Sequence, residues 1–174
     1  MLPSLILASV FIIFLGLIFM SFAYAGLRAA PWVPAWGRDI DRILRLADIK
    51  KGQVAYELGC GDGRILQAFE RAGAKAIGFE LAFAMYLWSK LRMFFGKNKN
   101  AKVRFRDFWN ISFADADVVY FYLMPHIYPK LEAKLKKELR PGTKIIVYAF
   151  PFPEWKPVKI DKETDQPTIY FYIV

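Results

Sequence analysis

The sequence predicts an α/β fold: a doubly wound sheet of about seven strands with the last strand antiparallel, preceded by one N-terminal transmembrane helix. Short apolar segments alternate with helix-like segments between residues 39 and 149, which is typical of a mainly parallel sheet. The segment Val54 to Leu58 ends in closely spaced glycines that open into a helix near Arg64, as in nucleotide-binding turns. Two strand-like segments joined by a polar loop end the chain and predict an antiparallel hairpin.

The N-terminal segment predicts a membrane anchor. Residues 2–27 contain no charged side chain, and residues 5–25 are long enough to cross about 30 Å of hydrocarbon as a helix. A cleaved signal peptide is the alternative, because Ala23-Tyr24-Ala25 resembles a cleavage site. The length of the apolar run and the lack of Lys or Arg before it favour the anchor. We therefore divide the chain into an anchor with its flank, residues 1–29, and one domain, residues 30–174.

The distribution of basic residues predicts on which side of the membrane the domain lies and which partners it can bind. Arg28, Arg38, Arg42 and Arg45 follow the span and no basic side chain precedes it, so the positive-inside rule predicts a single-pass membrane protein with its domain in the cytoplasm. The net charge of +9 favours anionic headgroups, at about 1 kcal/mol per well-placed Lys or Arg, and also permits nucleic acid binding. The single cysteine, Cys60, fits a reducing compartment, where we expect it to serve as a small residue in the turn.

The elements of the domain follow in order. The connector Pro31 to Trp36 is stiff and aromatic, and it is expected to lie at the membrane interface and to fold over the mouth of a binding site. The segment 81–95 is rich in Met, Phe, Tyr and Trp, most of which we expect in the core. Helices are predicted at 39–47, 64–72, 81–95 and 128–139, and strands at 54–58, 76–80, 102–106, 118–123, 144–149, 155–160 and 168–174. Pro157 confines the strand at 155–160 to an edge.

The glycine turn decides the kind of ligand. In the dinucleotide-binding turn of Rossmann folds the third glycine comes five positions after the first, but here Arg64 holds that place. The pattern of Gly59, Gly61 and Gly63, preceded by Glu57, instead resembles motif I of class I S-adenosylmethionine (SAM) methyltransferases. We therefore expect a Rossmann-like sheet in which these four residues and Asp62 bind the cofactor. The carboxylates of Glu57 and Asp62 suit a cationic ligand better than a pyrophosphate.

Three further residues complete the predicted cofactor site. Glu80 ends the second strand about twenty residues after the turn, where a carboxylate can accept hydrogen bonds from ribose hydroxyls. Asp107 follows the third strand and can accept from the adenine amino group, or simply cap a turn, while Phe108 packs beside the ring. The carboxyl ends of parallel strands form one edge of the sheet, so all these residues are expected together.

Catalytic residues are not defined by the sequence. Tyr122 and His126, after the fourth strand, are weak candidates, and His126 is the only histidine. No cluster of His or Cys predicts a metal site.

Several segments together resemble a particular family, the small membrane-anchored protein-lysine methyltransferases of mitochondria and their prokaryotic relatives. The segments are Pro31 to Pro34, Glu57 to Arg64, Gly78 to Leu81, Asp107 to Trp109, Pro125, Lys134 to Leu139 and Phe150 to Trp155. The family acts on the adenine nucleotide translocase and the ATP synthase c-subunit. The resemblance implies that a neutral lysine amine of a membrane or membrane-associated protein attacks the sulfonium methyl group. Where this chain has Glu57 and Cys60, the family usually has Asp and a small residue such as Ser.

Two other functions remain open. An RNA or DNA methyltransferase is the first, but enzymes of this fold that methylate exocyclic nitrogens tend to carry Asn/Asp-Pro-Pro-Tyr/Phe where this chain has Tyr122-Leu123-Met124-Pro125. A non-catalytic membrane scaffold is the second, and the intact glycine turn argues against it.

Overall fold

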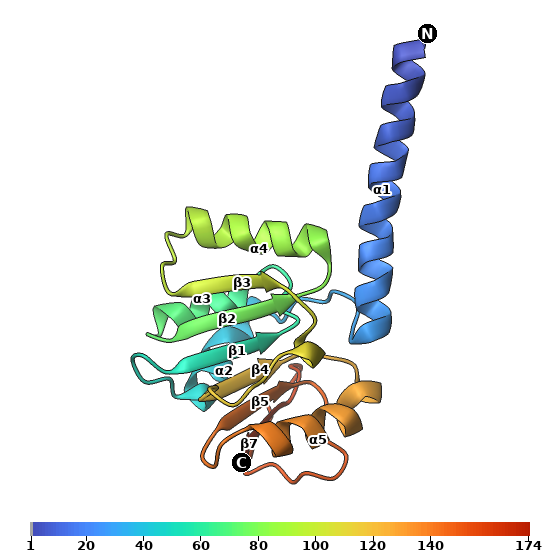
Figure 1. Cartoon of the computed structure of the whole chain (residues 1–174). Helices are drawn as coiled ribbons and strands as arrows, with labels where there is room; N and C mark the ends of the chain where they lie inside the picture. Colours follow the sequence, from blue (N-terminus) through green and yellow to red (C-terminus); the bar gives the residue numbers. More distant parts are fainter. Residues whose placement is uncertain (1) are drawn as a thin grey trace.

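A computed structural model describes residues 2–174. The first helix, α1 (Leu2–Arg28), projects from the domain, and only its C-terminal turns contact the domain (Figure 1). The segment Ser4–Arg28 is apolar and long enough to cross a membrane by length and composition. The arrowheads of β1, β2 and β3 point toward the domain end of α1, so this helix stands beside the carboxyl edge of the sheet (Figure 1).

One seven-stranded sheet forms the domain, in the order β3-β2-β1-β4-β5-β7-β6. Strands β1 to β5 pair in parallel, whereas β7 pairs antiparallel with both β5 and β6. The strands are β1 (Val54–Leu58), β2 (Lys75–Glu80), β3 (Ala101–Phe105), β4 (Val118–Phe121), β5 (Lys144–Tyr148), β6 (Lys159–Asp161) and β7 (Ile169–Ile173). The predicted fold class is confirmed, because the chain order reverses beside β1 and the last strand inserts antiparallel.

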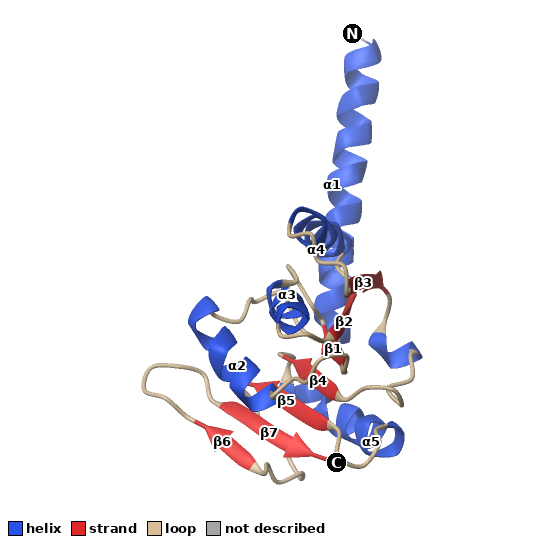
Figure 2. Cartoon of the chain, turned by 90° about the vertical axis from the view of Figure 1, so that its left-hand side faces the viewer, coloured by secondary structure: helices blue, strands red, loops and turns tan. Residues whose placement is uncertain are grey.

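Helices cover both faces of this sheet (Figure 2). One face carries α2 (Ile40–Ala47), α3 (Arg64–Arg71) and α4 (Phe83–Phe95), and the other carries α5 (Tyr128–Glu138). Three short 3-10 helices, η1 (Gly37–Asp39), η2 (Phe108–Asn110) and η3 (Pro125–Ile127), lie in the connections. Two of them, η2 and η3, follow the ends of β3 and β4, where the candidate site residues lie.

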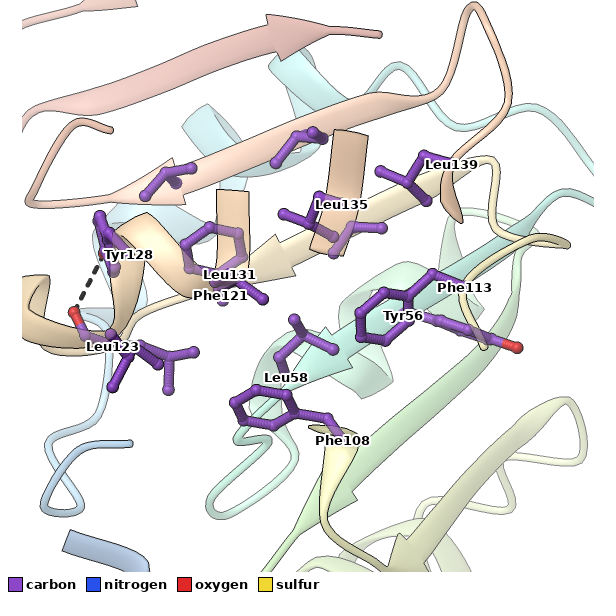
Figure 3. Packing of buried hydrophobic residues seen from close by; sticks show 14 of the residues in the cluster. Tyr56, Leu58, Phe108, Phe113, Phe121, Leu123, Tyr128, Leu131, Leu135 and Leu139 are labelled. Atoms are coloured by element: carbon purple, nitrogen blue, oxygen red, sulfur yellow. Dashed lines mark hydrogen bonds between the residues drawn. The ribbon is translucent and has the colours of Figure 1, made fainter. Parts of the chain in front are cut away.

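The α5 side of the core is built on apolar strand residues (Figure 3). Leu131 and Leu135 of α5 are fully buried together with Phe121 of β4 and Phe113, which precedes β4. The hydroxyl of Tyr128 donates to the carbonyl of Leu123 at 3.0 Å, which fixes the start of α5 against the end of β4 (Figure 3). The position of the β4 end is thereby set by buried packing.

Two expectations about elements are wrong. Most aromatic side chains of the helix at 81–95 are not in the core; Phe83, Trp88, Phe94 and Phe95 are exposed. The physical reason is that α4 covers the β3 edge of the sheet and buries only one narrow side. The strand predicted at 155–160 begins at Lys159 instead, because Pro157 cannot donate to the ladder and the ring of Trp155 packs on Phe152.

The arginines that follow the apolar helix do not all face solvent. Arg42 is buried and donates to Asp39 at 3.0 Å and to the Asp161 carboxylate in the β6–β7 hairpin. Its charge is therefore balanced within the domain and ties α2 to the far end of the sheet.

Candidate functional site

Two adjoining pockets lie at the carboxyl ends of β1, β2 and β4. The first, here the Glu80 pocket, has a cavity volume of about 60 Å³ and lies between the end of α1, Glu80 and Phe108. The second, here the Glu57 pocket, has a cavity volume of about 40 Å³ and lies beside Glu57 and Tyr120. Both volumes are below the roughly 300–1,000 Å³ usual for small-ligand sites. Residues that line both pockets are Trp32, Val33, Gly59, Gly61 and Tyr122.

The glycine turn forms the wall shared by the two pockets. Gly59, Gly61 and Gly63 have φ angles of +74°, +51° and +76°, a left-handed region that other residues rarely adopt. A Cβ atom on Gly61 would lie 2.8 Å from ring atoms of Trp32, so the connector lies directly on the turn. The expectation that Pro31 to Trp36 folds over the mouth of the site agrees with this contact.

Glu80 is held at the end of β2 by backbone donors. Its Oε2 accepts from the N–H of Gly61 at 2.7 Å, and its Oε1 accepts from the N–H groups of Leu81 and Ala82, both at 2.8 Å. Burial raises the pKa of Glu80 above its ordinary value, while these three hydrogen bonds oppose the shift. A carboxylate has about four acceptor positions, so the side chain retains acceptor capacity toward the pocket that it lines.

Glu57 and Tyr120 present unsatisfied polar atoms to the second pocket. Within residues 2–174, Oε2 of Glu57 and the hydroxyl of Tyr120 are buried without a hydrogen-bond partner. Burial and the nearby charge of Asp62 raise the pKa of Glu57 well above its ordinary value, and burial likewise raises the pKa of Tyr120. An unsatisfied buried polar group costs about 1–3 kcal/mol. A ligand that brings a donor or a positive charge here would remove this cost.

Asp62 is engaged by two guanidinium groups. Arg64 and Arg92 each approach its Oδ2 at 2.9 Å. Burial opposes ionisation of Asp62, but Arg64 and then Arg92 outweigh it and lower the pKa of this carboxyl. Asp62 lines the Glu57 pocket, yet its negative charge is already balanced. Its place in the structure is that of a clamp between the glycine turn and α4.

Asp107 is held by contacts within the protein, whereas Phe108 lines the Glu80 pocket. Asp107 accepts from the N–H of Trp109 at 3.0 Å and binds the guanidinium of Arg28, at the end of α1, at 2.6 Å. The Asp107 carboxylate therefore caps η2 and joins α1 to the domain. Phe108 is buried and lines the Glu80 pocket, where its ring can pack against a planar ligand.

Of the two weak catalytic candidates, only Tyr122 lies at the pockets. Tyr122 lines both pockets, and its ring is held against that of Tyr148 with centroids 4.8 Å apart. His126 is exposed in η3 and contributes to neither pocket. Cys60 is buried beside Ser89, and burial raises the pKa of its thiol well above the ordinary value, so it is not a reactive thiolate.

The end of α1 is part of the site, which the sequence pattern does not indicate. Phe22 and Ala25 line the Glu80 pocket, and the carbonyl of Ala29 accepts from the N–H of Met124 at 3.2 Å. Apolar residues of a membrane-length helix look alike whether they face lipid or protein. The one available signal is Arg28, whose charge needs a partner and finds it in Asp107.

These features fit an adenosyl ligand that carries positive charge. A left-handed glycine turn admits the ligand to the backbone, Glu80 provides sugar acceptors, and the unpaired oxygen of Glu57 favours a cation. A pyrophosphate would instead meet two buried carboxylates, those of Glu57 and Glu80, at this turn. The fold and the site together define a class I SAM-dependent methyltransferase domain.

Comparison with known proteins specifies the family. The chain belongs to the ANTKMT methyltransferase domain family, whose sequence model matches residues 57–159. It is 35% identical to the lysine N-methyltransferase of the ATP synthase c-subunit from Rattus norvegicus, over 73% of this chain and 59% of that protein. It is 29% identical to a protein-lysine N-methyltransferase of Saccharolobus islandicus over 83% of this chain and 93% of that protein.

A solved structure is similar over most of the chain. It is described as an RNA methyltransferase from Salinibacter ruber in complex with S-adenosyl-L-homocysteine, with a TM-score of 0.76 and 30% identity over 82% of this chain and 94% of that one. The chain spans less than two thirds of the rat and human methyltransferases of the ATP synthase c-subunit, 59% and 57% of their lengths. The resemblance found in the sequence is thus confirmed at the level of the family.

Proposed function

We propose that this chain is a SAM-dependent protein-lysine N-methyltransferase. In this proposal, residues 1–29 anchor it as a single-pass membrane protein, and residues 30–174 form the methyltransferase domain on the cytoplasmic side. Its substrate is a lysine of a membrane or membrane-associated protein. Relatives named as protein-lysine N-methyltransferases support the reaction, and the apolar α1 beside the Glu80 pocket supports the location.

The observation that carries the proposal is the pair of unsatisfied oxygens in the Glu57 pocket. Glu57 Oε2 and the Tyr120 hydroxyl lie in a pocket that adjoins the Glu80 pocket through the glycine turn. Such a pocket favours an ammonium group, which SAM carries. When bound, the cofactor supplies an electrophilic methyl group on a sulfonium.

Specific residues would hold that cofactor. Glu80 would accept hydrogen bonds from the ribose hydroxyls, and Phe108 would pack against the adenine ring. The turn at Gly59 and Gly61 would allow the backbone to approach the ligand closely. Glu57 would lie near its ammonium group. In Asp107, Oδ1 already accepts a hydrogen bond from the N–H of Trp109 and Oδ2 from Arg28. A hydrogen bond from the adenine amino group to Asp107 would therefore have to share an oxygen with one of these donors.

The lysine must lose its proton before it reacts. With an ordinary pKa near 10.4, the neutral amine carries a handicap of about 4–5 kcal/mol at neutral pH. Partial burial in the pocket lowers that pKa, because it disfavours the charged form. Trp32 and Tyr122 line both pockets, so their rings are placed to contact the incoming ammonium or the methylated product through cation–π interactions. Positioning and desolvation would then replace a dedicated base.

RNA methylation is the second candidate. The Salinibacter ruber structure described as an RNA methyltransferase is 30% identical, and the net charge of +9 permits nucleic acid binding. Exposed basic residues of α4 and β3, such as Lys90, Lys102 and Arg104, would then bind phosphates rather than lipid headgroups.

One experiment separates these functions. The full chain in nanodiscs is incubated with methyl-labelled SAM and a membrane fraction, then treated with RNase or with a protease. Protease-sensitive label that appears as methyllysine after acid hydrolysis supports the proposal. Label released by RNase identifies the second candidate and overturns the first. If the chain binds S-adenosylhomocysteine but transfers no methyl label to protein or to RNA, it is a non-catalytic scaffold.

A further inference from the structure

The outer side of α4 is an exposed apolar surface. We define the α4 apolar face as six large side chains that are 40% to 76% exposed: Phe83, Leu87, Trp88, Leu91, Phe94 and Phe95. At 100° per residue these positions fall within an arc of about 140°. The buried residues Met85, Ser89 and Met93 lie on the opposite side, toward β2 and β3. The helix is therefore apolar on its outward side as well as on the side that packs on the sheet, unlike a helix that only covers a sheet.

The position of α4 relative to α1 explains why its outward side is apolar. Figure 1 shows α4 as the outermost element of the domain on the side to which α1 extends, with the two helix axes strongly crossed. Ser21 of α1 joins them: its Oγ accepts from the N–H of Phe83 at 2.6 Å and lies 3.4 Å from the carbonyl of Leu81. The α4 helix packs on strands β2 and β3 on one side, so its apolar face points in the direction in which α1 leaves the domain.

The length of α1 beyond this junction matches a bilayer. From Ser4 to Met20 the helix extends about 26 Å at 1.5 Å per residue, close to the hydrocarbon thickness of about 30 Å. If α1 spans the membrane, the hydrocarbon boundary falls at the level of Ser21 and hence of α4. Interfacial helices bury their apolar face about 5–10 Å into this boundary.

Charge around α4 complements an anionic surface. Between residues 81 and 106 the sequence has seven Lys and Arg residues and no Asp or Glu. Six of them are exposed around α4 and along the edge strand β3: Lys90, Lys97, Lys99, Lys102, Arg104 and Arg106. Each such residue near anionic headgroups contributes about 1 kcal/mol. Trp88 adds a side chain that prefers the membrane interface.

We propose that α4 is an interfacial membrane helix that lies on the same anionic phospholipid bilayer that α1 crosses. The two crossed helices then fix the domain in one orientation, which a single span followed by a hinge would not. Leu81 and Ala82, which directly precede α4, and the last turns of α1, at Phe22 and Ala25, both line the Glu80 pocket. The reaction site is thereby held beside the headgroups, within reach of a lysine just outside the bilayer.

This inference rests on the membrane span in the proposed function, and the test separates the two. Nitroxide labels are placed by Leu91→Cys on the α4 apolar face, by Ile13→Cys in α1, and by Lys137→Cys on exposed α5, each in the full chain. Cys60 is buried and serves as the unlabelled background. The chains are reconstituted in nanodiscs of phosphatidylcholine with about one third phosphatidylglycerol. Electron paramagnetic resonance then measures how often each nitroxide collides with oxygen, which partitions into the bilayer, and with a water-soluble nickel chelate.

We expect the Leu91 and Ile13 labels to favour oxygen severalfold over the chelate, and the Lys137 label to favour the chelate. A Leu91 label that behaves as the Lys137 label, with Ile13 still in the bilayer, overturns the inference and leaves the span intact. An aqueous Ile13 label overturns the span itself. A Leu91 label shielded from both reagents in a concentration-dependent manner shows that a second copy covers α4, which also overturns the inference.

Discussion

Replacement of Glu80 by glutamine tests the centre of the site. The Glu80 carboxylate accepts from the backbone N–H groups of Gly61, Leu81 and Ala82 at 2.7–2.8 Å. In Glu80→Gln one oxygen becomes an amide NH2 group that faces a backbone donor, so at least one charge-assisted hydrogen bond is lost. Such a bond contributes about 1.5–3 kcal/mol. We expect the free energy of unfolding to fall by about this amount.

The same substitution should weaken ligand binding. The remaining acceptor positions of Glu80 are those that we assign to the ribose hydroxyls, and the neutral amide binds them less strongly than the carboxylate. A loss of about 1.5–3 kcal/mol corresponds to a roughly 10- to 100-fold increase in the Kd for S-adenosylhomocysteine.

Titration calorimetry of the full chain in detergent micelles measures the Kd, and urea unfolding measures the stability. Glu70→Gln is a matched control, because Glu70 accepts from the side chain of Asn98 and the N–H of Asn100 away from both pockets. The control should lose stability and keep its Kd. If Glu80→Gln binds S-adenosylhomocysteine within about threefold of the unmodified chain, the assignment of the pocket is refuted.

Three other substitutions test the turn, the fold and the buried acid. Gly61→Ala places a methyl group 2.8 Å from the Trp32 ring at a φ of +51°, so calorimetry should show about tenfold weaker binding of S-adenosylhomocysteine or worse; equal affinity contradicts the close approach. Arg42→Ala leaves Asp39 buried without its counter-charge, and the free energy of unfolding in urea should fall by about 3–5 kcal/mol, whereas a loss below roughly 1 kcal/mol would mean that the network is dispensable. Glu57 has a raised pKa, so the folded chain keeps this proton to higher pH than the unfolded chain, and stability should decline as pH rises above 4.5, by up to about 1.4 kcal/mol per pH unit. Glu57→Gln should flatten that decline, and identical slopes in urea titrations between about pH 5 and 7 argue against the buried neutral acid.

The regular part of the fold could be predicted from local pattern. The run from Val118 to Leu123 predicts an inner strand because a strand with helices over both faces must be apolar on both sides, and β4 spans Val118–Phe121 of it. The glycine turn and Glu80 could be predicted because their backbone conformation and spacing are local requirements of a binding edge. Edge elements were less predictable: Pro157 delays β6 to Lys159, and only pairing with β7 determines where that strand begins.

The chemical state of the site residues depends on tertiary contacts. Asp62 and Glu57 are both acidic residues at the turn, but Arg92 of α4 reaches Asp62 and leaves Glu57 Oε2 unpaired. Asp107 similarly receives Arg28 from a helix that lies 79 residues earlier in the chain. Residue spacing in the sequence does not predict these ion pairs, because the side chains meet only after folding has brought distant segments together.

The sequence by itself therefore determined the sheet, the class of cofactor site and the presence of a membrane-length helix, since each is encoded in a short periodic or glycine-rich segment. Only the tertiary structure decided that α1 walls the pocket and that the aromatic residues of α4 face outward. Transfer of an apolar side chain from water lowers the free energy, whether the side chain enters the protein core or the membrane. The sequence records that preference, whereas the arrangement of α1, α4 and the β3 edge determines which environment is within reach.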